Sequence, residues 1–186
     1  MGKIFFLFGG SPENLRAKAL LEKWRQEGMG GVFIVTGYPN DKAGELQSMV
    51  DYLLSNGVPE NQIFIDSSYE TFSNVESLEK YLINRKIELD ECEIFASTGI
   101  LHWIRFKLIF LWGFRYGKHF NFFEIKFIPS GEQEIWYAAI AILPYILLTP
   151  KGFQIMTRFI RRKEYALCKN SDYLASIAEK FGVNLV

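Results

Sequence analysis

Five short apolar runs recur along the chain, and a segment long enough for a helix follows most of them. Strands that alternate with helices of about 10–15 residues are typical of βαβ units, which build a parallel sheet. Nearly continuous apolar runs also fit strands that are covered on both faces. The sequence therefore predicts a three-layer, Rossmann-like α/β domain with a mainly parallel sheet of about five strands. The expected strands are Ile4–Phe8, Val32–Thr36, Ile63–Ile65, Glu93–Ser97 and Ile125–Ile128.

Helix signals fill the gaps between these runs. Ser11 is an N-cap residue type, and Pro12 follows it at the first helical position. We expect one domain over residues 1–130 and a helical extension with no strand signal over residues 131–186, packed on or beside that domain. The expected helices of the domain are Ser11–Gln26, Glu45–Ser55, Phe72–Arg85 and Ile100–Trp112.

Charge and cysteine content limit the classes of partner. The chain has 21 basic and 21 acidic residues, so no net field attracts nucleic acid, and we expect no nucleic-acid partner. Cys92 and Cys168 match no metal or redox spacing, which favours two ordinary thiols in a reducing compartment. The apolar run at the N-terminus is too short for a signal peptide. We therefore expect a cytoplasmic protein.

One segment adds a membrane alternative. Residues 135–150 carry no charge, but this stretch is shorter than the roughly 20 residues of a spanning helix, and Pro144 interrupts it. A basic run from Arg158 to Lys163 follows. Residues 135–163 are therefore compatible with peripheral contact with an anionic membrane, and equally with an amphipathic helix whose basic side faces solvent.

The ends of the expected strands share one chemical character. Ligands of open parallel sheets bind beyond the carboxyl ends of the strands, where the strand order reverses. Glycine lets a backbone approach a ligand closely, and hydroxyls both donate and accept hydrogen bonds. Each end alone is ordinary loop chemistry, but together they predict a single crevice. The ends in question are Gly9-Gly10, Thr36-Gly37, the loop from Asp66 to Thr71, and Ser97-Thr98.

His102 and Arg105 lie on the helix expected after the fourth strand. They are three residues apart and so share one helix face, one turn from Ser97 and Thr98. Imidazole, guanidinium and hydroxyl groups together suit an anionic or phosphate-like group. A lone histidine on a helix is more often a core or surface group, but these neighbours favour a site role. No second His, Asp or Glu lies at a metal-ligand spacing from His102, so we expect no metal.

Seven short pieces follow one another along the chain: Gly9-Gly10, Arg16 with Ala19, Thr36-Gly37, Glu45 with Met49, Gly57-Val58-Pro59 with Ile63, Glu70–Asn74, and Ser97-Thr98 with His102 and Arg105. In this order they resemble the SanA/YdcF-like family, a domain of unknown function associated with bacterial envelope biogenesis. The resemblance covers roughly residues 4–130. Thr36 replaces the serine that is typical of the family, and Trp103-Ile104 replaces its usual residues between the histidine and the arginine.

The resemblance implies two functions of different classes. In the first, the protein is a hydrolase or transferase of cell-envelope metabolism that acts on an anionic substrate. His102 would then be the general acid or base. Arg16 and Arg105 would stabilise negative charge, and Glu45 would orient one of them. In the second, it is a non-catalytic module that binds S-adenosylmethionine, as some relatives do, or another protein. The ligand-binding residues implied for a small anionic or nucleotide-like ligand are Gly9, Gly10, Arg16, Thr36, Gly37, Thr71, Asn74, Ser97 and Thr98.

Structural roles compete with several of these assignments. Arg16 has a surface alternative, and Glu45 at a helix start is favoured by the helix dipole alone. Thr71 has the alternative of capping the helix that follows. Asn74 has no obvious structural purpose in the sequence, so we assign it to the site.

Overall fold

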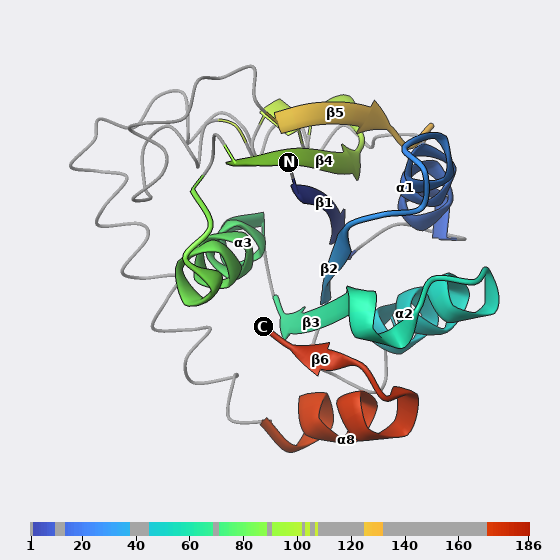
Figure 1. Cartoon of the computed structure of the whole chain (residues 1–186), viewed down its shortest axis with the longest axis vertical. Coiled ribbons are helices and arrows are strands. Elements are labelled where there is room, and N and C mark those ends of the chain that lie inside the picture. Colours follow the sequence, from blue (N-terminus) through green and yellow to red (C-terminus); the bar gives the residue numbers. More distant parts are fainter. Residues whose placement is uncertain are drawn as a thin grey trace.

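A six-stranded, all-parallel sheet forms the centre of the computed structural model (Figure 1). The structure describes residues 2–9, 14–37, 45–68, 71–88, 91–101, 103–104, 107, 125–131 and 171–186. Its strand order is β5-β4-β1-β2-β3-β6, which confirms the predicted Rossmann-like α/β fold. The strands are β1 (Gly2–Phe8), β2 (Val32–Gly37), β3 (Ile63–Ser67), β4 (Cys92–Thr98), β5 (Ile125–Pro129) and β6 (Asn184–Leu185).

The described helices agree with the sequence except at the start of the first. Helix α1 begins at Leu15, later than the start at Ser11 that the capping pattern predicted. Asn14 has a left-handed backbone with φ of 55°, and such a residue interrupts a right-handed helix. The helix bounds are α1 (Leu15–Gln26), α2 (Glu45–Ser55), α3 (Thr71–Arg85) and α8 (Ser171–Phe181), with a short 3₁₀ turn, η2, at Glu60–Gln62. After β4, residues 100, 101, 103, 104 and 107 are helical.

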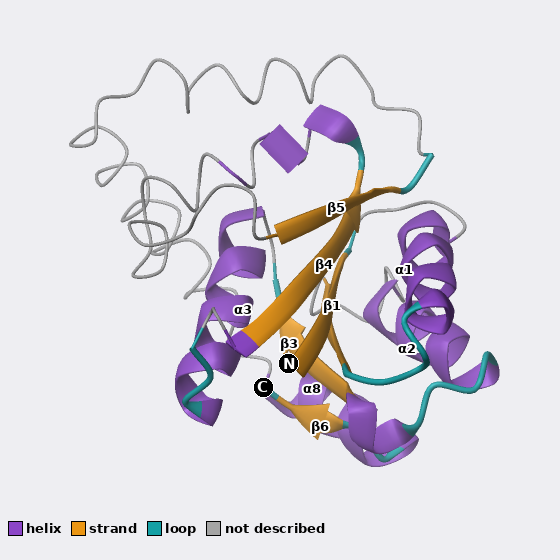
Figure 2. Cartoon of the chain, turned by 45° about the horizontal axis from the view of Figure 1, so that its top comes forward, coloured by secondary structure: helices purple, strands orange, loops and turns teal. Residues whose placement is uncertain are grey.

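Side chains of the sheet alternate between two packed layers, as successive strand residues must. Helices α1 and α2 cover one face and α3 covers the other (Figures 1 and 2). We call the buried residues on these faces the α1-side cluster and the α3-side cluster. The α1-side cluster includes Phe5, Leu7, Leu20, Trp24, Phe33, Leu46, Met49, Phe95, Ile177 and Val183. The α3-side cluster includes Ile4, Phe6, Phe8, Ile34, Val75, Leu78, Leu82, Ile94 and Ala96.

Phe5 sits at the centre of the α1-side cluster. Its ring centroid lies 5.1 Å from that of Phe33 on β2 and 5.3 Å from that of Phe95 on β4. All three rings are fully buried, and burial of each contributes about 1.5–3 kcal/mol. This stack fastens the three central strands to one another.

The chain reverses its direction across the sheet between β1 and β4. It runs from β1 to β2 to β3 on one side, then returns past β1 to β4 and β5. Right-handed crossovers place helices on opposite faces for these two directions, and Trp103, after β4, packs against the α3-side cluster. The β1–β4 boundary is therefore the switch point at which such sheets bind ligands.

The end of the chain adds a strand that the sequence did not predict. β6 pairs with β3, and the backbone N–H of Val186 donates to the carbonyl of Ile65 at 3.2 Å. Ile177 of α8 and Val183 are buried in the α1-side cluster. The expectation that residues 131–186 contain no strand is therefore wrong. The sequence does not reveal β6 because two residues are too few to show an alternating apolar pattern.

Residues 135–163, which carry the membrane alternative, lie outside the described residues. Among the helices that the structure does describe, none has both the length and the apolar character needed to cross a bilayer.

Candidate functional site

Gly9 lies just beyond β1, and two charged side chains meet there. Arg16 of α1 donates a hydrogen bond from Nη1 to the Gly9 carbonyl oxygen. The Glu45 carboxylate, from the first residue of α2, lies against the Gly9 Cα, so that a methyl group there would come within 2.7 Å of Oε2. The missing side chain of Gly9 thus makes room for Glu45.

The burial of Arg16 decides between its two interpretations. Only 3% of the residue is exposed, so the surface alternative is wrong. Glu45 is partly exposed, and it begins α2, where the helix dipole also favours a carboxylate. Two of the residues expected at the crevice, Arg16 and Glu45, are therefore brought together at a third, Gly9.

Thr36 and Asn74 form a second contact at this edge of the sheet. The Thr36 hydroxyl donates to Asn74 Oδ1 and lies 3.2 Å from the carbonyl oxygen of Leu7. Both side chains are buried. We expected no structural purpose for the Asn74 side chain, and this is wrong. Its hydrogen bond with Thr36 connects the first turn of α3 to the end of β2.

Gly37 has a packing role. A Cβ on Gly37 would lie 3.1 Å from Leu46 Cβ and 3.3 Å from Met49 Cε, so glycine lets α2 pack closely on β2. The Gly37 carbonyl oxygen accepts a hydrogen bond from the Ser68 N–H at 2.8 Å. These contacts account for the glycine without a ligand.

Within the described part of the chain, three buried hydroxyls at the ends of β4 and β5 have no hydrogen-bond partner. They belong to Ser97, Thr98 and Ser130, which are 0%, 1% and 7% exposed. Ser130 adjoins the others, since its N–H lies 3.4 Å from the carbonyl oxygen of Thr98. Most buried polar groups in proteins are paired, so three orphans at adjacent strand ends need an explanation.

The orphaned hydroxyls face both sides of the sheet. Ser97 follows Phe95 of the α1-side cluster, and Thr98 follows Ala96 of the α3-side cluster, so their side chains point to opposite faces. Ser97 is paired with Leu7 of β1 and Thr98 with Pro129 of β5. The hydroxyls therefore border the switch point from its β4 side.

Sequence reasoning missed Ser130. It directly follows the last residue of β5, so the rule that singled out the other strand ends applies to it equally. The strand predicted from the sequence ends at Ile128, two residues before this hydroxyl. Extending the rule to the fifth strand would have found this hydroxyl.

Other residues of the expected site are placed only in part. The Asp66 carboxylate accepts the Ser67 N–H at 2.9 Å and lies 3.4 Å from Lys80 Nζ, so it is held by protein groups. Thr71 is the first residue of α3. Gly10, His102 and Arg105 lie outside the described residues.

The largest described pKa shift lies away from these strand ends. Hydrogen bonds from Lys23 and Lys3 lower the pKa of Glu27 to about 2. Lys3 is in β1 near its amino end, and Glu27 follows α1, so this ion-pair group ties a helix end to the sheet. Burial lowers the pKa of Lys107, whose amine lies 4.7 Å from the Trp103 ring centroid. The pairing with Lys23 and Lys3 accounts for the lowered pKa of Glu27, and burial accounts for that of Lys107. Neither pKa shift therefore needs a functional site to explain it.

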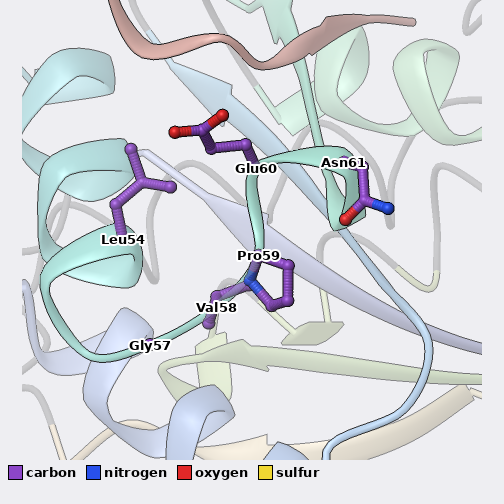
Figure 3. A pocket seen from close by; sticks show the side chains of 6 residues that line it. All are labelled: Leu54, Gly57, Val58, Pro59, Glu60 and Asn61. Carbon is purple, nitrogen blue, oxygen red and sulfur yellow. The ribbon is translucent and has the colours of Figure 1, made fainter.

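A hollow of about 470 Å³ opens at the opposite end of the sheet, where the strands begin (Figure 3). It lies in the connection from α2 to β3, at the amino end of β3, whereas ligands of parallel sheets bind at the carboxyl ends. We therefore do not assign the candidate site to it. Its lining residues are Leu54, Gly57, Val58, Pro59, Glu60 and Asn61.

Metal-ligating groups do not cluster within the described part of the chain, where no three His, Cys, Asp or Glu residues lie together. Comparison of the whole chain with family models, with curated proteins and with solved structures finds no match.

Proposed function

We propose that the carboxyl ends of β1, β4 and β5 bind a small anionic or nucleotide-like ligand. The observation that carries this proposal is the set of unpartnered, buried hydroxyls of Ser97, Thr98 and Ser130 at adjacent strand ends. Leaving a buried hydroxyl unpaired costs about 1–3 kcal/mol, and ligand oxygens at this position would supply the missing partners. The location at the switch point supports the same conclusion.

We further propose, on the resemblance to the SanA/YdcF-like family, that the ligand belongs to cell-envelope metabolism. If the protein is an enzyme, His102 acts as general acid or base and Arg105 stabilises negative charge on the substrate. Arg16 then has a positioning role, because its guanidinium holds the Gly9 carbonyl. The alternative is a non-catalytic S-adenosylmethionine-binding module. The Glu45 carboxylate favours it, because a carboxylate accepts hydrogen bonds from ribose hydroxyls.

The first experiment is a thermal-shift screen with S-adenosylmethionine, nucleotides and polyprenyl phosphates. A ligand at 100 times its Kd adds about 2.7 kcal/mol of stability, which is easily detected. A shift with a nucleotide or a phosphate supports the proposal. A shift with S-adenosylmethionine and no turnover supports the alternative. No shift with any of them would overturn both.

The second experiment uses the unpaired state of the hydroxyls. Ser97→Ala and Thr98→Val remove an orphaned group, so the ligand-free variants should be as stable as the wild type or more stable. The same variants should bind the screened ligand about 10-fold less tightly, since each loses one hydrogen bond to it. A loss of stability without a loss of binding would mean that the hydroxyls serve the fold only.

A further inference from the structure

We infer that the ligand of this site is polarised: a hydroxyl-bearing, uncharged part lies against Glu45 at Gly9, and the anionic part lies over the ends of β4 and β5. This inference rests on the proposed function, because it assigns two parts of one ligand to two parts of the same site. It makes Glu45 a specificity-determining residue, one that excludes phosphate from the end of β1.

The exposure of Arg16 and Glu45 determines which of their charges a ligand contacts at Gly9. Arg16 is 3% exposed, and its guanidinium is bound to the Gly9 carbonyl oxygen. Glu45 is partly exposed, and its carboxylate lies against the Gly9 Cα. A ligand that arrives at Gly9 therefore meets the carboxylate first. A carboxylate offers about four lone-pair positions, so it can accept a ligand hydroxyl in addition to any protein donor.

Distance separates the two parts of the site. Neighbouring strands are about 4.8 Å apart, so the end of β5 lies roughly 10 Å from Gly9, with β4 between them. The Glu45 carboxylate repels a phosphate much more strongly at about 4 Å than at about 10 Å, where physiological salt screens most of the repulsion, and the buried Arg16 guanidinium offsets part of it. The unpartnered hydroxyl of Ser130, directly after β5, lies on that far side and can donate to an anion, and Ser97 on β4 lies between it and β1. A sugar phosphate has both kinds of group in one molecule.

Calorimetric titration with three probes tests the inference: ribose 5-phosphate, ribose and inorganic phosphate. The wild type should bind ribose 5-phosphate about 10-fold or more tightly than inorganic phosphate, because only the former also reaches Glu45. Glu45→Gln keeps the size of the side chain and removes its charge. In this variant inorganic phosphate should bind about 10-fold more tightly, because it is no longer excluded from the end of β1, and the advantage of the sugar phosphate should shrink.

Gly9→Ala provides a matched variant that leaves Glu45 in the sequence. The added methyl group would lie 2.7 Å from Glu45 Oε2, which is the far end of a flexible side chain. The carboxylate should therefore move while the fold is kept, and Gly9→Ala should show the same change in probe preference as Glu45→Gln. If Gly9→Ala fails to fold, Glu45→Gln still decides.

The outcomes separate this inference from the proposed function. Equal probe preferences in the wild type and in Glu45→Gln, together with weaker binding by Ser97→Ala, would overturn the polarised ligand and leave the binding site standing. Binding of none of the three probes by the wild type would also overturn the inference. The proposed function fails only if the wider screen gives no shift as well.

Discussion

The hydroxyl of Thr36 at the end of β2 is hydrogen bonded to the side-chain carbonyl of Asn74 in the first turn of α3, and both groups are buried. Thr36 follows Ile34, a member of the α3-side cluster, so its side chain faces α3. This bond adds to the packing of the α3-side cluster, which holds α3 on the face opposite α1 and α2.

Replacing Thr36 with valine should lower the free energy of unfolding by about 1–3 kcal/mol, because Asn74 Oδ1 would stay buried without its donor. Thr36→Ser keeps the hydroxyl and should cost less. Urea denaturation of both variants measures the difference. Ser97→Ala removes an orphaned hydroxyl and should show no such loss. Equal stability of Thr36→Val and the wild type would contradict the assigned bond.

Gly37→Ala should destabilise the protein by about 1–3 kcal/mol. The new methyl group would lie 3.1 Å from Leu46 Cβ, which the α2 backbone holds in place, so α2 would be pushed away from β2. Gly30→Ala is the control, because a Cβ there meets nothing within 4 Å. That variant should be neutral or slightly stabilising, since it restricts the unfolded chain. Thermal unfolding of the two variants compares them directly, and equal effects would show that the contact is unimportant.

Glu27 should stabilise the fold at neutral pH and lose this effect in acid. Its pKa is lowered from the ordinary value of 4.5 to about 2, so the folded state binds its proton less readily than the unfolded state. The contribution is therefore complete above about pH 4.5 and disappears as the pH falls to about 2. The difference in unfolding free energy between the wild type and Glu27→Gln should follow this window. Glu22→Gln, an exposed change on α1, should show a much weaker dependence, and identical profiles would refute the assignment.

Ile177→Ala should destabilise the whole domain by about 2–5 kcal/mol, because the side chain is buried in the α1-side cluster and its removal leaves a cavity. Unfolding followed by tryptophan fluorescence and by circular dichroism should give one coincident transition. Glu179→Ala, an exposed change on the same helix, should have little effect. A separate early transition in Ile177→Ala would mean that α8 and β6 fold independently of the sheet.

The strands and most helix bounds were predictable because their signals are local. Each predicted strand lies within an observed one, and α2 has the predicted bounds. The order of the strands depends on crossovers between distant segments, and no local pattern encodes it. β6 escaped prediction for a similar reason, since its two residues form a strand only through their pairing with β3.

The candidate site was likewise predictable only where its features follow from local sequence. The strand-end rule identified Gly9, Thr36, Ser97 and Thr98 as residues at one edge, because chain position alone places them there. Their partners come from side-chain geometry, and so the Thr36–Asn74 bond and the Glu45–Gly9 contact required the structure. The roles assigned to His102 and Arg105 stay predictions.

The pairing of β3 with β6 has a consequence for how the protein is made. β3 is complete once residue 67 has been synthesised, but its neighbour β6 comes from residues 184 and 185. At about 5–20 residues per second, a ribosome leaves that flank of the nascent sheet open for on the order of ten seconds. An open flank is a template on which another chain can pair. Expression yield should therefore depend on translation speed and on chaperones that shield this edge.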